Sequence, residues 1–161
     1  MLYPLDSLRM VEASEQPQGT LLMAIAGNGT SRLILVAGSG EEADKLAVSL
    51  GGPQPFHVHR LAAFKGVVCP QLDAPRVEIS EPTTDPTWLG TLMLDENGAW
   101  MALRIQGGFG DETAFLRLQD WVLHSNPPSS GERRYFDNWR LIDGPSDTPR
   151  EIFQVTAALR V

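Results

Sequence analysis

Residues 92–103 read LMLDENGAWMAL, and this stretch carries the strongest pattern for the fold. An Asn-Gly pair tolerates positive φ at both central positions of a two-residue hairpin turn. A turn at Asn97-Gly98 sets two apolar pairs on one face, Leu94–Met101 and Leu92–Leu103. The opposite face carries Thr91, Asp95, Trp100 and Arg104. The pattern therefore predicts a hairpin with one buried face and one partly exposed face.

A second Asn-Gly pair, Asn28-Gly29, predicts another hairpin. A two-residue turn there gives four cross-strand pairs: Met23–Ile34, Leu21–Val36, Leu22–Leu35 and Ala24–Leu33. Both faces of this hairpin are apolar, so we expect it to be central, with covering layers on both sides.

Helices are expected to supply part of that cover. Ser39 and Glu42 have capping-box spacing. Apolar residues then follow at helical intervals up to Gly51-Gly52, namely Ala43, Leu46, Ala47 and Leu50. A second helix is predicted after Thr148-Pro149, although alternation over 153–161 also fits a strand. A third helix is predicted over 111–124.

Four further segments have strand character: 56–61, 66–69, 76–80 and 135–142. Two Pro-rich segments, 81–86 and 125–131, read as surface loops. Neither loop is long enough to separate domains, so we expect one globular domain over 1–161. The predicted class is α+β: an antiparallel or mixed sheet built from hairpins, with about three helices packed on it.

Composition limits the partners and the compartment. The net charge is −7, which disfavours general nucleic-acid binding and attraction to anionic membranes. The longest apolar run, 21–26, is far shorter than a membrane helix, and the N-terminus does not resemble a signal peptide. Cys69 is the single cysteine, so no intramolecular disulfide can form. These features predict a cytoplasmic protein.

The sharpest chemical feature is the pair His57 and His59. Residues i and i+2 of a strand point to the same face, so two imidazoles there can share a divalent metal. His124 is the only other histidine, and the candidate third ligand is either His124 or a carboxylate such as Asp73 or Glu78. The alternative is two solvated or packed histidines on a surface strand.

Gly51, followed after five residues by His57-Val58-His59, resembles the opening of the cupin metal motif. The resemblance implies a metal-dependent enzyme on a double-stranded barrel. It covers nine residues only. The glutamate ligand of that family would stand at position 63 or 64, where this chain has Ala63 and Phe64, and the second motif is not found around His124.

The segment Gly38-Ser39-Gly40-Glu41-Glu42-Ala43 matches the G-x-G-x-x-A pattern of dinucleotide-binding loops. In such a loop, Glu41 and Glu42 would lie beside the phosphates of the ligand, where like charges repel. A helix capping box accounts for the same residues without a ligand. Nucleotide binding is therefore a third hypothesis, and it requires a parallel β-α-β unit around Gly38.

Bases and aromatics interleave over 133–140. Arg133, Arg134, Trp139 and Arg140 could bind an anion or an acidic partner, or else be core aromatics beside solvated arginines. No complete catalytic constellation is visible anywhere in the chain. The best functional prediction is a non-catalytic domain without a cofactor. We expect its partner to be another protein, a small ligand or a second copy of the chain, as in a homodimer.

Overall fold

The structure is a computed structural model that describes residues 10–25, 31–39, 45–52, 54–61, 64–69, 75–107, 110–126 and 131–156. These residues form strands β1 to β14 and one 3-10 turn, η2 (Ala13–Glu15), with no α-helix among them. The predicted α+β class is therefore wrong, because the described chain is nearly all β.

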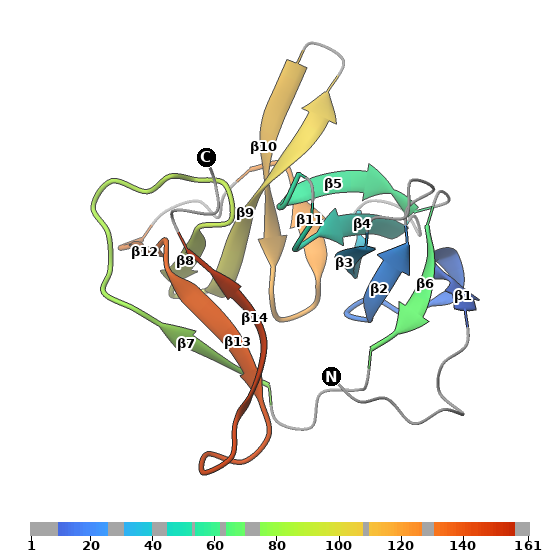
Figure 1. Cartoon of the computed structure of the whole chain (residues 1–161). Coiled ribbons are helices and arrows are strands. Elements are labelled where there is room, and N and C mark those ends of the chain that lie inside the picture. The colour runs from blue at the N-terminus through green and yellow to red at the C-terminus, as the bar shows by residue number, and fades with distance from the viewer. Residues whose placement is uncertain are drawn as a thin grey trace.

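Six strands close into a barrel (Figure 1). In order around the ring they are β3 (Ser31–Gly38), β4 (Lys45–Ser49), β5 (His57–Arg60), β9 (Gly98–Gly107), β10 (Gly110–Arg117) and β11 (Val122–His124). The β5–β9 and β11–β3 junctions are parallel, and the other four are antiparallel. Closure leaves no free strand edge within this ring.

Side chains alternate between the barrel interior and its outer surface, as the strand period requires. On β10, Ala114 and Leu116 belong to the interior cluster, whereas Phe115 between them packs with Trp100 outside. The interior cluster also includes Leu35, Val48 and Leu103 from the other barrel strands. The barrel is therefore a packed core rather than an open channel.

Three more strands extend the sheet from β3, in the order β2 (Leu21–Ile25), β6 (Lys65–Val68) and β1 (Met10–Glu12). A second cluster forms here from Leu22, Ala24, Ile34, Val36 and neighbouring residues. Leu21 and Leu35 belong to the interior cluster instead. The expectation that the β2–β3 hairpin is apolar on both faces and covered on both is thus confirmed.

β8 (Leu92–Asp95) pairs with β9 on one side and with β12 (Arg134–Phe136) on the other. On the outer face, Met93 and Trp100 are buried, and so is Thr91 just before β8. Asp95 on the same face is half-buried and Arg104 is exposed, so the expectation of a partly exposed second face is confirmed, with its buried part under β12 and the chain before β8.

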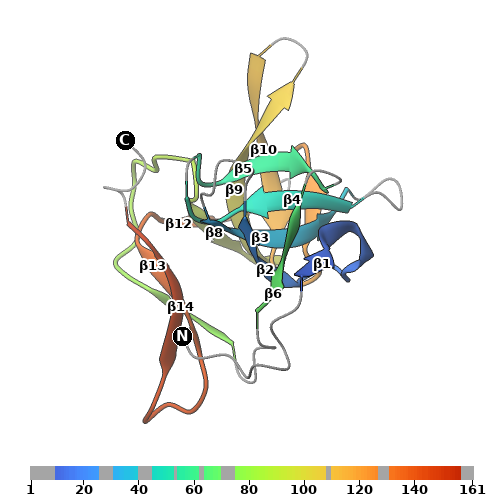
Figure 2. The same cartoon turned by 45° about the vertical axis from the view of Figure 1, so that its right-hand side comes forward.

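The remaining strands form a separate antiparallel sheet in the order β14 (Arg150–Val155), β13 (Trp139–Asp143) and β7 (Arg76–Ile79). Figures 1 and 2 both show this small sheet standing beside the barrel. Trp139 and Val155 pack in the same cluster as Leu35 and Met101 of the barrel. The small sheet thus contributes to the main core.

The hairpin at Asn97-Gly98 exists, but its register differs from the expected one by two residues. Leu92 pairs with Met101, and Asp95 pairs with Gly98. The Asp95 carboxylate accepts a hydrogen bond from the Asn97 backbone N–H at 2.7 Å, so the two-residue turn is Glu96-Asn97. The predicted Leu94–Met101 pair is therefore wrong. A shift of two preserves which residues share a face, and Leu92, Met101 and Leu103 are buried together.

The β2–β3 hairpin is also confirmed, with a register shifted by one residue. Leu22 pairs with Ile34 and Met23 with Leu33. The expected turn residues Asn28-Gly29 lie outside the described residues. Because both faces are apolar, the hydrophobic pattern does not distinguish the two registers.

None of the three predicted helices is present where the chain is described. The first is replaced by β4 over Lys45–Ser49, and residues 40–44 lie outside the described part. The second is β14, which agrees with the rival alternation at 153–155, while residues 157–161 lie outside the described part. The third is β10, a turn and β11. Capping signals are local, and pairing with neighbouring strands outweighed them.

The shorter strand predictions are confirmed as β5, β6 and β7, while 135–142 divides into β12 and β13 around a turn. Residues 81–86 form a loop, as expected, with one bridge from Thr83 to Tyr135. In the part of the chain that is described, no helix is long and apolar enough to cross a membrane.

Candidate ligand cavity

The two histidines of β5 lie together on the outer face of the barrel. The rings of His57 and His59 stack with centroids 6.4 Å apart, and both side chains are half-buried. Burial, Arg32 and His57 together lower the pKa of His59, so its neutral form is favoured. His57 Nδ1 lies 2.9 Å from the Pro55 carbonyl oxygen.

His124 packs elsewhere, with its ring edge-on to Trp100 at 5.2 Å. In the described residues, no three His, Cys, Asp or Glu side chains converge to hold a metal ion. The metal hypothesis thus keeps the His57–His59 pair, without a third ligand from the described chain. Asp73 lies outside the described residues.

The condition set for nucleotide binding is not met. Gly38 ends β3 and pairs antiparallel with Lys45 of β4, which is the next element in the described chain. The Gly38 N–H donates to the Trp121 carbonyl oxygen at 2.9 Å, which helps close the barrel. Most of the proposed phosphate loop, 40–43, lies outside the described residues.

The residues of the predicted anion cluster over 133–140 lie on β12, just before it and on β13. Arg140 pairs with Glu78 and Glu151 on the small sheet, and Arg134 pairs with Glu132. Arg133 lies before β12 and is half-buried. Trp139 is 4% exposed, and its Nε1–H donates to the Gly90 carbonyl oxygen at 2.9 Å. Of these residues, Trp139 reaches the cavity described next, while anion binding by the arginines stays a prediction.

An apolar cavity of about 200 Å³ lies between the barrel and the small sheet. We call it the interface cavity. Its barrel side is formed by residues including Leu35, Leu50 and Met101, and its other side by Val77, Trp139, Leu141 and Phe153. Trp139 and Phe153 meet edge-to-face with centroids 5.3 Å apart. These walls come from strands that are distant in the sequence.

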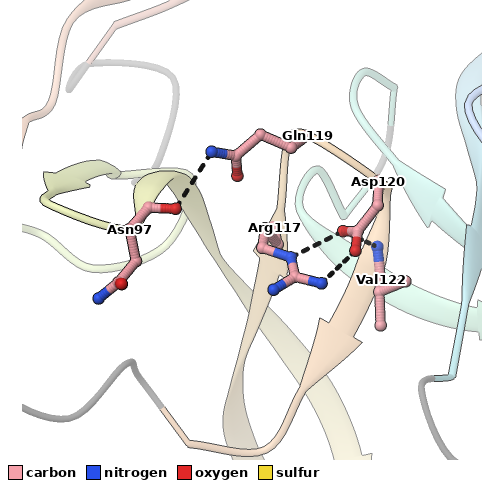
Figure 3. A network of polar contacts seen from close by, with 5 residues as sticks. All are labelled: Asn97, Arg117, Gln119, Asp120 and Val122. Carbon is pink, nitrogen blue, oxygen red and sulfur yellow. Dashed lines mark hydrogen bonds and ion pairs between the residues drawn. The ribbon is translucent and has the colours of Figure 1, made fainter.

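Trp121 forms part of the wall, and the turn between β10 and β11 fixes its position. Arg117 forms an ion pair with Asp120, which also accepts a hydrogen bond from the Val122 N–H at 3.3 Å (Figure 3). Hydrogen bonding from Arg117 holds the pKa of Asp120 below its usual value. Gln119 ties the same turn to the Asn97 carbonyl oxygen at 3.1 Å.

Gly19 permits the close approach of Trp121. Its φ is +83°, and a Cβ there would lie 2.6 Å from the indole Nε1. Any side chain at this position would both strain the backbone and collide with the ring. A second hollow of about 530 Å³ adjoins the interface cavity and shares Gly19, Leu21, Pro75 and Trp121 with it. Half-buried Cys69 lines this second hollow.

Arg76 is the one ionisable residue among the described residues that line the interface cavity. Its guanidinium donates to Ser146 Oγ at 2.7 Å and to the Gly144 carbonyl oxygen at 3.1 Å. Both acceptors are neutral, and no described carboxylate forms an ion pair with it. The lining therefore combines apolar side chains with one arginine, whose guanidinium forms no ion pair with a described carboxylate.

Sequence reasoning missed this site except for Trp139. Its lining residues run from Gly19 to Phe153, and nothing local to the sequence brings them together. Trp121 and Phe153 fall in two separate segments for which the sequence favours helices, and no local pattern indicates that they share a wall.

Comparisons with protein-family models, with curated proteins and with solved structures found no match for this chain, so the geometry alone carries the functional argument.

Proposed function

We propose that the protein binds a small amphipathic carboxylate in the interface cavity, without transforming it. The observation that carries this proposal is the pairing of apolar, aromatic-rich walls with Arg76, which forms no ion pair with a described carboxylate. Small-molecule sites are typically apolar clefts with a few polar groups that orient the ligand. An aromatic ring or short alkyl chain would occupy the cavity, and its carboxylate would pair with Arg76.

The size of the cavity limits the ligand. A dry cavity of about 150 Å³ accepts benzene, and drug-sized ligands need about 300 Å³ or more. The interface cavity, at about 200 Å³, suits a single ring or a short chain. The adjoining hollow gives room for a longer tail.

Binding is favoured over catalysis by the chemistry of the lining. Apart from Arg76, the described lining residues are apolar or glycine. They offer no group that could exchange a proton near neutral pH, and Arg76 stays protonated. For the compartment we retain the reducing cytoplasm as a proposal, on the basis of the single, half-buried Cys69.

The test uses 4-phenylbutyrate and its neutral analogue 4-phenylbutanol, followed by tryptophan fluorescence and calorimetry. We expect 4-phenylbutyrate to bind with a Kd of about 0.1–1 mM, given its size. Arg76→Gln should weaken 4-phenylbutyrate about 3- to 10-fold and leave 4-phenylbutanol unchanged. Equal effects of Arg76→Gln on both compounds would contradict the role of Arg76.

A matched pair of variants tests the location. Val77 and Ile79 lie two residues apart on β7, and their exposed fractions are 38% and 43%. Val77 lines the cavity, whereas Ile79 does not. Val77→Trp should fill the cavity and abolish binding, while Ile79→Trp should bind like the wild type. Loss of binding in both variants, or in neither, would refute the proposed location.

A further inference from the structure

The barrel and the strands beside it consist of two halves with the same pairing scheme. In chain order the first half is β2, β3, β4, β5 and β6, and the second is β8, β9, β10, β11 and β12. In both halves the first strand pairs antiparallel with the second and the fifth, and the third pairs antiparallel with the second and the fourth. The fourth strand of each half then pairs parallel with the second strand of the other half. The two halves are therefore two copies of one structural unit.

Both halves open with the same tripeptide, Gly-Thr-Leu, at 19–21 and at 90–92. The two glycines have positive φ, at +83° and +73°. Each glycine N–H donates a hydrogen bond of 2.8 Å to the second strand of its own half, to the carbonyl oxygen of Val36 or of Ala102. The leucines occupy matching register positions opposite β3 and β9. The two copies thus correspond residue by residue at this point.

An aromatic ring from the opposite half packs on each glycine. Phe56 and Trp121 directly precede β5 and β11, and their φ angles are 61° and 62°. A Cβ on Gly19 would lie 2.6 Å from the Trp121 ring, and a Cβ on Gly90 would lie 2.6 Å from the Phe56 ring. The correspondence therefore extends from strand pairing to backbone conformation and to the contacts of both glycines.

The two glycines differ in what reaches their carbonyl oxygens. The indole N–H of Trp139 donates to the Gly90 oxygen at 2.9 Å, and this indole is buried in the main core with Phe56 and Phe136. No residue in the described ranges donates to the carbonyl oxygen of Gly19. Gly19 instead lines the second hollow, whose volume is about 530 Å³.

The lining of the second hollow corresponds to the surroundings of the Trp139 indole. The Cys69 N–H donates to the Leu21 carbonyl oxygen, at the position where Phe136 pairs with Leu92 in the other half. Cys69 and Leu21 line the hollow, while their counterparts pack with Trp139. A cavity of about 150 Å³ accepts benzene, so the hollow has room for a larger, bicyclic ring.

We propose that the second hollow binds the indole ring of a small neutral molecule. The indole N–H donates to the Gly19 carbonyl oxygen, as Trp139 does at Gly90. None of the described residues that line the hollow is Asp, Glu, Lys, Arg or His, so the ring needs no counter-ion. The site adjoins the interface cavity but does not use Arg76, so it is independent of the carboxylate site proposed there.

The test is calorimetry with two isomers, 3-methylindole and 1-methylindole. The first has the shape of a tryptophan side chain and keeps the N–H, whereas the second has the same size and lacks the donor. We expect 3-methylindole to bind with a Kd of about 0.1–1 mM. The loss of one hydrogen bond should make 1-methylindole bind about 3- to 10-fold more weakly. Equal affinity of the two isomers, or no saturable binding of 3-methylindole up to about 5 mM, overturns the proposal.

A matched pair of variants tests the location. Cys69→Phe introduces the residue found at the corresponding position of the other half and should fill the hollow, so 3-methylindole should no longer bind. Val67→Phe is the control, because Val67 lies two residues earlier and does not line the hollow. Unchanged binding in folded Cys69→Phe, or an equal loss in folded Val67→Phe, refutes the location.

The thiol of the wild-type protein gives a readout that does not depend on a variant. Cys69 is the single cysteine and is half-buried in the hollow, so a maleimide reports on this site alone. At about 5 mM, 3-methylindole should slow the labelling of Cys69 about three-fold or more, and 1-methylindole should slow it less. Labelling that is unchanged by 3-methylindole contradicts the site.

Discussion

Leu103→Ala tests the barrel core. Leu103 is 1% exposed and packs in the interior cluster with Met101 and Leu116. Deleting a buried leucine side chain loses its transfer free energy and leaves a cavity, at a cost of about 3–4 kcal/mol. A domain of this size has a total stability of about 5–15 kcal/mol, so the variant should still fold. We expect its Tm to fall by about 6–16 °C in a thermal melt followed by circular dichroism.

Leu94→Ala is the matched control on the same hairpin. Leu94 is half-buried and pairs with Ala99 near the turn, rather than with Met101. Its truncation should cost about 1 kcal/mol. Urea unfolding of both variants gives the two free energies directly. Equal losses for Leu94→Ala and Leu103→Ala would refute the observed register and the position of the core.

Three further outcomes are expected. Asp137→Ala should destabilise by about 2–3 kcal/mol in urea unfolding, because the buried carboxylate accepts from Thr87 and from the Thr91 hydroxyl; an unchanged midpoint would contradict this. Gly66→Ala should lower the free energy of unfolding by about 1–3 kcal/mol, since the new Cβ would lie 2.8 Å from a backbone oxygen of β2. Gly51→Ala should lower it by less, because the nearest atom to a Cβ there is 4.0 Å away. The pKa of His59 is lowered in the folded protein, so the unfolded chain binds the proton more readily. The free energy of unfolding should therefore fall as the pH drops from about 7 through 6.5, and it should level off below the pKa of the folded protein. This part of the pH dependence should vanish in His59→Gln.

The sequence pattern identified the hairpins but not how they join. The two Asn-Gly pairs, with the apolar residues that flank them, located β2, β3, β8 and β9, since a turn signal and its flanking residues are local features of the sequence. The parallel junctions β5–β9 and β11–β3 link segments distant in the sequence, and no local signal encodes them. The barrel could therefore not be predicted from the hairpins alone.

The helix predictions failed for a related reason. Ala47 and Val48 are adjacent, and both have no exposed surface. A strand covered on both faces is apolar at consecutive positions, so it loses the alternation that distinguishes it from a helix. Residues Ala114 to Leu116 of β10 show the same pattern, with all three buried.

The candidate sites also differ in whether the local sequence could predict them. His57 and His59 were placed on one face correctly, because i and i+2 of a strand depend only on local geometry. The interface cavity combines Leu35, Trp121 and Phe153, whose proximity depends on the packing of the small sheet against the barrel. Sites of that kind require the three-dimensional structure.

Binding of a small carboxylate in the interface cavity can be followed at the indole N–H signals of the tryptophans. Trp121 and Trp139 line the cavity, whereas Trp88 lies exposed against Tyr135 and Trp100 packs in the outer cluster. In ¹H–¹⁵N spectra of labelled protein titrated with 4-phenylbutyrate, we expect saturable shifts of the Trp121 and Trp139 signals alone. Saturable shifts confined to Trp88 or Trp100, or no shift of any indole signal at about 10 mM ligand, well above the expected Kd, would contradict it.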